Sequence, residues 1–215
     1  AARVYMNQLL AGNGETSARH EVEIDRDADG EGRRIVAWDH AVLRDEAGRP
    51  AGLLCFGVDL TEYRLVDEQN RFLMSHDELT GLANRSLFMD RLWLAIAGAR
   101  RHRGKAAVLF IDLDGFKPVN DTYGHEAGDL VLQQISLRVS ETIRATDTMA
   151  RYGGDEFAIL LTEVARREDA ARVAAEAIRA LRRPFTIRGV AVTVGASIGI
   201  AIFPDDAEDA DELVL

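Results

Sequence analysis

The residues best suited to chemistry are two adjacent carboxylates, Asp155 and Glu156, which follow the glycine pair Gly153-Gly154. β-forming residues flank this stretch on both sides, from 149 to 161. A Gly-Gly link between two strands predicts a tight hairpin, because both central residues of a type I′ turn need a positive φ. The hairpin would hold both carboxylates at an exposed tip, within reach of a metal ion or a phosphate. Taken alone, the stretch also fits an ordinary hairpin with solvated acids.

A second acidic position lies at the end of the apolar run 105–111, which predicts a buried strand. Asp112 follows directly, and an acid there is costly unless it is paired or bound to a metal. Gly115 lets the chain turn so that backbone N–H groups can face a ligand. Residues 120–129 are dense in hydrogen-bonding groups and precede a predicted amphipathic helix. The apolar positions of that helix are Leu130, Val131, Ile135, Leu137, Val139 and Ile143.

These motifs, in this order, resemble those of the GGDEF-domain family, the diguanylate cyclases. The matching segments are 77–85, 112–117, 120–129, 153–157 and 194–201. The resemblance covers residues 77–215 as a cyclase domain, and it implies an α/β (α+β) fold. In that fold a mainly antiparallel central sheet of the nucleotidyl-cyclase palm type is surrounded by helices.

The resemblance implies an enzyme that condenses two GTP molecules into cyclic di-GMP and releases two pyrophosphates. Each domain of a homodimer would hold one GTP. Asp112, Asp155 and the backbone carbonyl of Leu113 match the positions that hold Mg²⁺ (or Mn²⁺), an ion that takes oxygen ligands. Asp155 and Glu156 match the catalytic acidic cluster.

The family's guanine-reading positions fall on Asn120 and Asp129, whose amide and carboxylate can bond the edge of the base. His125 matches a further substrate-contact position, and local packing at a helix start is the alternative for it. The resemblance also implies a phosphate cradle of backbone N–H groups with a lysine nearby. Its residues are Gly115, Phe116 and Lys117.

Arg144 and Asp147 match the family's Arg-x-x-Asp product-inhibition site, at the usual spacing before the glycines. Arginine binds phosphate or a guanine edge through two parallel hydrogen bonds. The resemblance therefore implies that cyclic di-GMP inhibits the protein at this site. An ordinary surface pair of little energetic value is the alternative.

Residues 1–62 have a different character, with strands predicted at 22–24, 35–43 and 52–58 between turn-rich stretches. They resemble the C-terminal part of a PAS sensor domain, with Trp38 on the middle strand, although other β-meanders share this pattern. Residues 63–76 predict a helical, coiled-coil-like linker. Its a/d positions would be Tyr63, Val66, Asn70 and Leu73, and a single surface helix is the alternative.

The composition narrows the function. A net charge of −10 over 215 residues argues against binding to a nucleic-acid backbone. No apolar run approaches the length of a membrane span, so we expect a cytoplasmic domain whose longer parent can still carry a membrane anchor. In the family, a Lys and an Arg that clamp the GTP phosphates follow the point where this sequence ends, so we expect a truncated domain. A GTP- or cyclic di-GMP-binding module without turnover is therefore the alternative function, and a purely sensory or dimerisation piece is a third.

Overall fold

The structure, a computed structural model, describes residues 17–24 and 33–214. The chain divides into two compact units, Ala1–Arg71 and Phe72–Leu215. Each unit is built on a β-sheet of its own.

The described part of the first unit is an antiparallel sheet of three strands in the order β1-β2-β3. The strands are β1 (Ser17–Ile24), β2 (Arg34–Arg44) and β3 (Pro50–Asp59), which confirms the three predicted strands and lengthens each of them. Trp38 lies on the central strand opposite Gly57, and its ring covers the position that a side chain on Gly57 would need. Residues 25–32, the turn-rich stretch between the first two predicted strands, lie outside the described residues.

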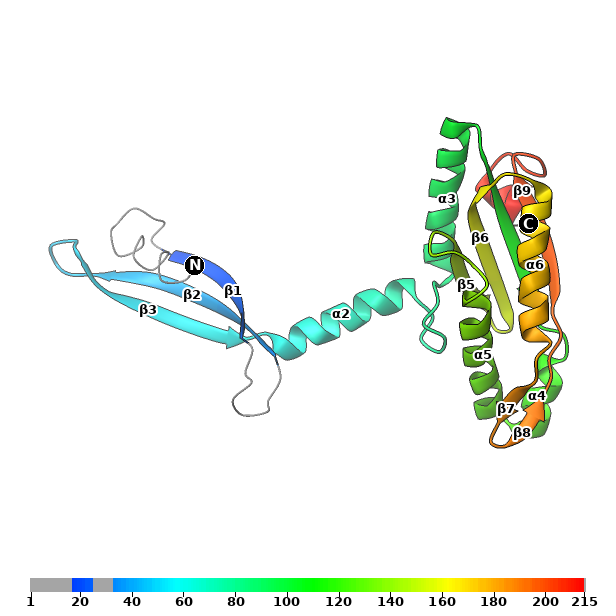
Figure 1. The fold of residues 1–215 in the computed structure, drawn as a ribbon. Helices are drawn as coiled ribbons and strands as arrows, with labels where there is room; N and C mark the ends of the chain where they lie inside the picture. Colours follow the sequence, from blue (N-terminus) through cyan, green and yellow to red (C-terminus); the bar gives the residue numbers. More distant parts are fainter. Residues whose placement is uncertain (1–16, 25–32, 215) are drawn as a thin grey trace. The chain divides into compact units, whose positions relative to one another are not determined.

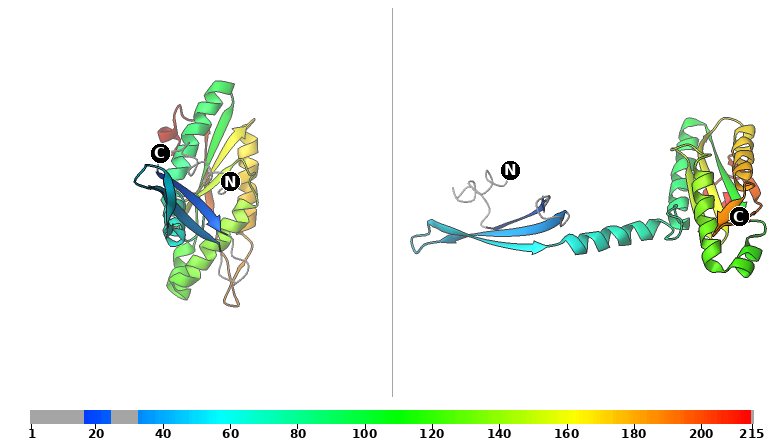
Figure 2. Two further views of the ribbon diagram at one scale, coloured as in Figure 1. Left: turned by 90° about the vertical axis from the view of Figure 1, so that its left-hand side faces the viewer. Right: turned by 60° about the horizontal axis from the view of Figure 1, so that its bottom comes forward.

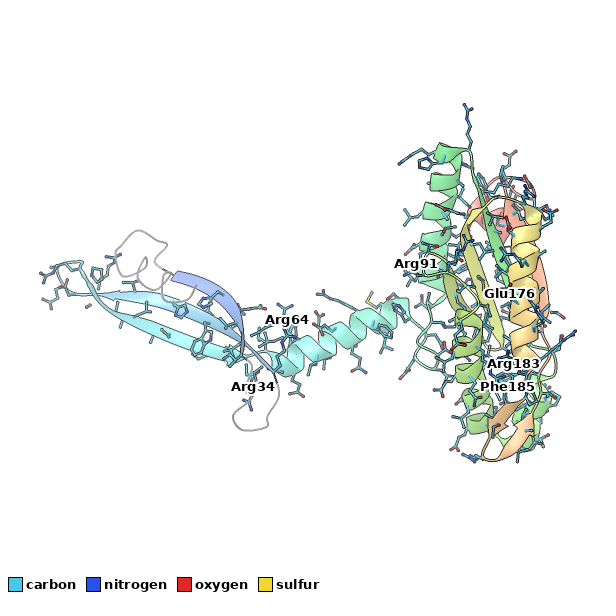
Figure 3. The ribbon with its side chains drawn as sticks, viewed as in Figure 1. Arg34, Arg64, Arg91, Glu176, Arg183 and Phe185 are labelled. Atoms are coloured by element: carbon cyan, nitrogen blue, oxygen red, sulfur yellow. The ribbon has the colours of Figure 1, made fainter. Side chains whose placement is uncertain are left out.

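Helix α2 (Thr61–Ser75) confirms the helix predicted for the linker. Its first turn is fixed by Asp59, whose carboxylate accepts hydrogen bonds from the backbone N–H and the hydroxyl of Thr61. Arg64, labelled in Figure 3, donates to both carboxylate oxygens of Glu21 on β1 at 2.8 and 2.7 Å. None of the residues of α2 is buried.

The second unit is built on an antiparallel sheet in the order β5-β6-β4-β9, which confirms the predicted mainly antiparallel central sheet. The two central strands are the buried apolar runs β4 (Lys105–Asp112) and β6 (Glu156–Val164). The two edge strands are β5 (Thr148–Gly153) and β9 (Ser197–Phe203). A separate ribbon pairs β7 (Phe185–Ile187) with β8 (Val190–Val192).

Helices cover both faces of this sheet (Figure 1). Helix α3 (Arg85–His102) and the short α7 (Ala210–Leu213) pack on one face, against Val108, Ala158 and Leu160. On the other face lie α4 (Phe116–Tyr123), α5 (His125–Ser140) and α6 (Arg167–Leu181). The sheet therefore lies between two helical layers, which Figure 2 shows from two further sides.

Two predictions for the helical part need correction. The polar segment 120–129 does not precede a helix: it spans the end of α4 and the start of α5, with Gly124 between them. Of the apolar positions predicted on this helix, Ile143 lies beyond its last residue, Ser140. Leu137 and Leu130 are 68% and 38% exposed, whereas Leu132 is buried. The reason is that α5 packs on its neighbours through Val131, Ile135 and Val139, a face that excludes Leu130 and Leu137.

Candidate active site

The acidic residues from two distant motifs meet at one end of the central sheet. Asp112, the last residue of β4, pairs directly with Glu156, the first residue of β6. On its other side Asp112 pairs with Ser197, the first residue of β9. Because side chains alternate along a strand, all three share the face of Val108 and Leu160, the face that α3 covers further along. The strand pairing thus brings the two predicted carboxylate motifs together.

A hollow of about 370 Å³ opens at this end of the sheet. Its lining includes Asp112, Glu156 and Ser197. Phe110, two residues from Asp112 on β4, and Gly199, two residues from Ser197 on β9, also line it. Asp112 and Glu156 are exposed, so both carboxylates are accessible to a ligand from solvent. The lining thus combines two carboxylates with apolar residues, a composition that suits a cation held partly by a larger ligand.

The hairpin turn is present, but its position corrects the prediction. Gly153 is the last residue of β5 and pairs with Glu156, so Gly154 and Asp155 are the two linking residues. Only Gly154 has a positive φ, of 53°, so the turn is not the predicted type I′ turn centred on Gly153-Gly154. An irregularity in pairing between Arg151 and Gly153 shifts the register by one residue. Asp155 thereby lies in the turn itself, half-buried, one residue before Glu156.

The predicted phosphate cradle coincides with the N-terminus of α4. Gly115 is the N-cap residue, with a φ of 80°, and no side chain caps the helix. The first N–H groups of a helix have no partner within it, and together with the helix dipole they form a ready anion site. Phe116 begins the helix with its ring buried, while Lys117 is exposed beside it. Only Asp114 separates Leu113 from Gly115, so the predicted cradle follows closely after Asp112 and Leu113 in the chain.

The predicted guanine-reading residues lie on the α4–α5 pair. The side chain of Asn120 lies against α5 so closely that a Cβ on Gly128 would be 1.8 Å from its Oδ1 atom. That buried oxygen has no hydrogen-bond partner in the structure. A buried polar atom without a partner is costly, so a hydrogen-bond donor that reached this atom would stabilise it. His125 and Asp129 are exposed on α5 four residues apart, which places them on one side of that helix.

Arg151 connects the hairpin turn to the loop that precedes α3. Its guanidinium donates to the carbonyl oxygen of Gly154 at 2.9 and 2.8 Å. It also donates to both carboxylate oxygens of Asp77 at 3.2 Å. Burial alone would raise the pKa of Asp77, but hydrogen bonds from Thr80 and Arg151 outweigh it and hold that pKa below its usual value. Arg151 therefore links the carbonyl of Gly154, the residue before Asp155, to the half-buried carboxylate of Asp77.

The oxygen donors near this sheet end suit the implied Mg²⁺ ion. Among the described residues no three His, Cys, Asp or Glu side chains converge on one point. The loop and the turn offer instead two carboxylates, Asp112 and Asp155, and the carbonyl of Leu113. Mg²⁺ is usually held by one or two carboxylates together with substrate phosphates and water, so an all-oxygen set of this size fits the ion.

Arg144 and Asp147 lie away from this hollow, in the turn that precedes β5. The Asp147 carboxylate accepts a hydrogen bond from the backbone N–H of Arg144 at 3.1 Å, and Arg144 is exposed. Both residues line a larger hollow of about 670 Å³, to which Arg172 also contributes. The lining of this hollow shares no residue with that of the strand-end hollow. The two predicted sites are thus physically separate.

Several residues that organise the site were not predicted from the sequence. Asp77 and Arg151 each stand in or beside a recognised motif, but nothing in the spacing shows that they form a pair. The same holds for Asp114 and Ser197, whose side chains are hydrogen-bonded. The sequence signal for these residues was their position in or beside the motif segments. That they contact each other is shown only by the three-dimensional structure.

Comparison with known proteins gives the same identification as the motifs. Residues 74–215 match the family described as "Diguanylate cyclase, GGDEF domain". The chain is 46% identical over 192 residues to the diguanylate cyclase TpbB of Pseudomonas aeruginosa, covering 88% of this chain and 43% of TpbB. It is 48% identical over 143 residues to MucR of the same organism, named a bifunctional diguanylate cyclase/cyclic di-GMP phosphodiesterase, covering 66% of this chain and 21% of MucR. The chain therefore spans less than half the length of these relatives.

Solved structures resemble the second unit. The GGDEF domain of TpbB (YfiN) superposes with a TM-score of 0.63 at 44% identity, over 65% of this chain and 81% of that one. The coiled coil and GGDEF domain of DgcB from Caulobacter crescentus, in complex with cyclic di-GMP, gives a TM-score of 0.64 at 28% identity, over 71% and 81%. None of the helices in the described residues is both long and apolar enough to cross a membrane. With its acidic motifs joined at one sheet end and its family match over residues 74–215, this chain belongs to the GGDEF-domain diguanylate cyclase family.

Proposed function

We propose that this protein is a diguanylate cyclase that condenses two GTP molecules into cyclic di-GMP and two pyrophosphates, with Mg²⁺ (or Mn²⁺) as cofactor. The observation that carries the proposal is the direct pairing of Asp112 with Glu156, which joins the two acidic motifs at an accessible hollow. The proposal assigns the reaction to the cytoplasm, where GTP is available.

In this mechanism each residue acts according to its position. Asp112, Asp155 and the Leu113 carbonyl would hold Mg²⁺, which when bound offsets negative charge on the phosphates of the attacked GTP. The N–H groups of Gly115 and Phe116 at the start of α4 would bind the terminal phosphates, with Lys117 as a nearby charge.

Asn120 and Asp129 would read guanine, and the orphaned Oδ1 atom of Asn120 supports that role. His125 would contact the substrate from the same side of α5 as Asp129. Asp155 would also assist removal of the proton from the attacking 3′-hydroxyl, and Glu156 would complete the acidic cluster.

The reaction needs two copies, because one domain holds each GTP. The exposed apolar residues of α2 support a dimer through this helix: Tyr63 is 67% exposed, Val66 50% and Leu73 37%. Apolar side chains repeated at a/d spacing on a helix with no buried residue are typical of a coiled-coil seam. The sheet of the first unit would act as the C-terminal part of a PAS-like sensor upstream of this linker.

Product control would use the separate hollow beside Arg144 and Asp147. The cyclic di-GMP complex of the DgcB domain supports binding of this product by such a domain. The exposed guanidinium of Arg144 is available for a phosphate or a guanine edge.

The test is chromatographic detection of cyclic di-GMP after the chain is incubated with GTP and Mg²⁺, beside the variants Asp155→Asn and Asp90→Asn. Asp90 is exposed on α3 and serves as the matched control. Product from the wild type and from Asp90→Asn, but not from Asp155→Asn, supports the proposal. Binding of GTP or cyclic di-GMP without product would favour the alternative, a nucleotide-binding module without turnover, and no binding of either would favour a sensory or dimerisation role.

A further inference from the structure

Two polar residues without a role in the proposed reaction meet beside the strand-end hollow. The hydroxyl of Ser197, at the start of β9, lies 3.1 Å from each carboxylate oxygen of Asp114 and donates to that group. Asp114 stands two residues after Asp112, in the loop between β4 and α4. Its backbone N–H donates to the carbonyl of Gly195 at 3.0 Å, and its carbonyl accepts from the N–H of Gly195 at 2.9 Å. The loop is thus fastened to the β9 side by both backbone and side chain.

The close approach of the two segments depends on Gly195. A Cβ at this position would lie 3.1 Å from the Cβ of Asp114 and 3.3 Å from its Oδ2 atom. The first distance is tighter than ordinary packing, so a larger residue would push Asp114 away from Ser197. The sequence therefore supplies a small residue, a hydroxyl and a carboxylate at the three positions that this contact requires.

The fastened loop joins the two parts of the proposed site. It begins at Asp112, the proposed Mg²⁺ ligand, and ends at Gly115 and Phe116, whose N–H groups stand at the start of α4. The first N–H groups of a helix have no partner within the helix. Gly115 has access to more backbone conformations than other residues, so this stretch would lose considerable entropy on ordering. Bonds that order this loop in the free protein reduce the loss of conformational entropy that accompanies GTP binding.

We propose that Ser197 and Asp114 are a positioning pair that holds the β4–α4 loop ready for the triphosphate of a nucleotide with its Mg²⁺. Neither residue contacts the reacting atoms in this scheme; both act through the loop. The inference rests on the proposed function, because it assigns the pair to the GTP phosphates.

The test measures the dissociation constant of GTP in the presence of Mg²⁺ for the full chain and three variants. Ser197→Ala removes the hydrogen bonds, Ser197→Thr keeps a hydroxyl, and Thr193→Val removes an exposed hydroxyl from the same connection to β9. Loss of a hydrogen bond of this kind corresponds to a rise in the dissociation constant of roughly two- to tenfold. We expect that rise in Ser197→Ala alone. Amide hydrogen exchange at Gly115 and Phe116, measured without nucleotide, should also be faster in this variant alone.

Each outcome has a distinct meaning. If Ser197→Ala binds GTP as tightly as Thr193→Val while the wild type binds normally, the positioning role is refuted and the proposed function stands. If Ser197→Thr is as weak as Ser197→Ala, the hydroxyl is not the cause and the inference is also refuted. If the wild type itself neither binds GTP nor makes cyclic di-GMP, the proposed function fails, and the positioning role for its substrate fails with it.

Discussion

Replacing Asp77 with alanine should loosen the β5–β6 hairpin from outside the active site. Asp77 has no metal-binding or substrate-binding role in the proposed mechanism, yet it holds Arg151 by two hydrogen bonds of 3.2 Å. Arg151 in turn holds the carbonyl of Gly154, the residue before Asp155. The expected effect on turnover therefore passes through Arg151 to the turn.

The cost follows from burial and charge. The side chains of Arg151 and Asp77 are 16% and 23% exposed, so solvent screens their interaction only partly. Hydrogen bonds to charged groups in such settings contribute roughly 1.5–3 kcal/mol. For a domain of this size, a change of 1 kcal/mol moves Tm by about 2–4 °C, so Asp77→Ala should lower Tm by about 3–12 °C.

The same bridge predicts how stability depends on pH. The folded-state pKa of Asp77 is held below its ordinary value of 3.8. The stabilisation is therefore fully present above the unfolded-state pKa and is lost as the pH falls through the lower, folded-state pKa. The difference in the free energy of unfolding between the wild type and Asp77→Ala should consequently disappear in strongly acidic buffer.

The assays are thermal unfolding at neutral pH and urea unfolding at neutral and at acidic pH, with cyclic di-GMP turnover measured beside them. Asp90→Ala, which removes an exposed carboxylate from α3, is the control, and Arg151→Ala with the double variant completes a double-mutant cycle. We expect a coupling energy of about 1 kcal/mol or more between Asp77 and Arg151. Equal stability of Asp77→Ala and Asp90→Ala at neutral pH, or additive effects in the cycle, would refute the reasoning.

Three further predictions test other parts of the molecule. Gly128→Ala should keep the fold, since alanine favours helix, but the new Cβ would displace the Asn120 side chain. GTP binding, measured by calorimetry, should weaken by roughly 1–3 kcal/mol. Gly98→Ala, where a Cβ meets no atom within 4 Å, should show no such loss. Val66→Glu should shift the chain from dimer to monomer in analytical ultracentrifugation, because it places a charge in the proposed apolar seam, and a persistent dimer would rule out α2 as the interface. Arg144→Ala should abolish tight cyclic di-GMP binding while the chain still makes product, and unchanged binding would remove the inhibitory assignment.

Much of the fold was predictable because its signals are local. The apolar run 105–111 and the β-forming residues around 149–161 gave strands at those places, and the structure confirms them as β4, β5 and β6. Helical periodicity located α5, but it could not tell which apolar positions face the core. Leu137 fits the period and is nonetheless 68% exposed, because the packing partners of a helix decide which stripe is buried.

The hairpin turn shows where local reasoning stops. The glycine pair predicts a turn centred on both glycines, whereas the structure centres it on Gly154 and Asp155. The ring of Tyr152 packs edge-on against Phe110 at 5.0 Å on the α3 side of the sheet, and Arg151 closes the turn through Gly154. These contacts help to set the register of the strand, and the spacing of two glycines in the sequence does not reveal them.

The sequence by itself determined the family and the residue types of the proposed site, because chemistry limits which side chains can hold an oxygen-seeking ion, a phosphate or a guanine edge. Only the tertiary structure decided that Asp112 faces both Glu156 and Ser197, that Arg151 reaches Asp77 across 74 residues, and that Asp114 reaches Ser197 across 83. These contacts depend on strand order and register, which the chain sets through cooperative packing of residues far apart in sequence. Propensity and periodicity act over a few residues and therefore cannot specify them.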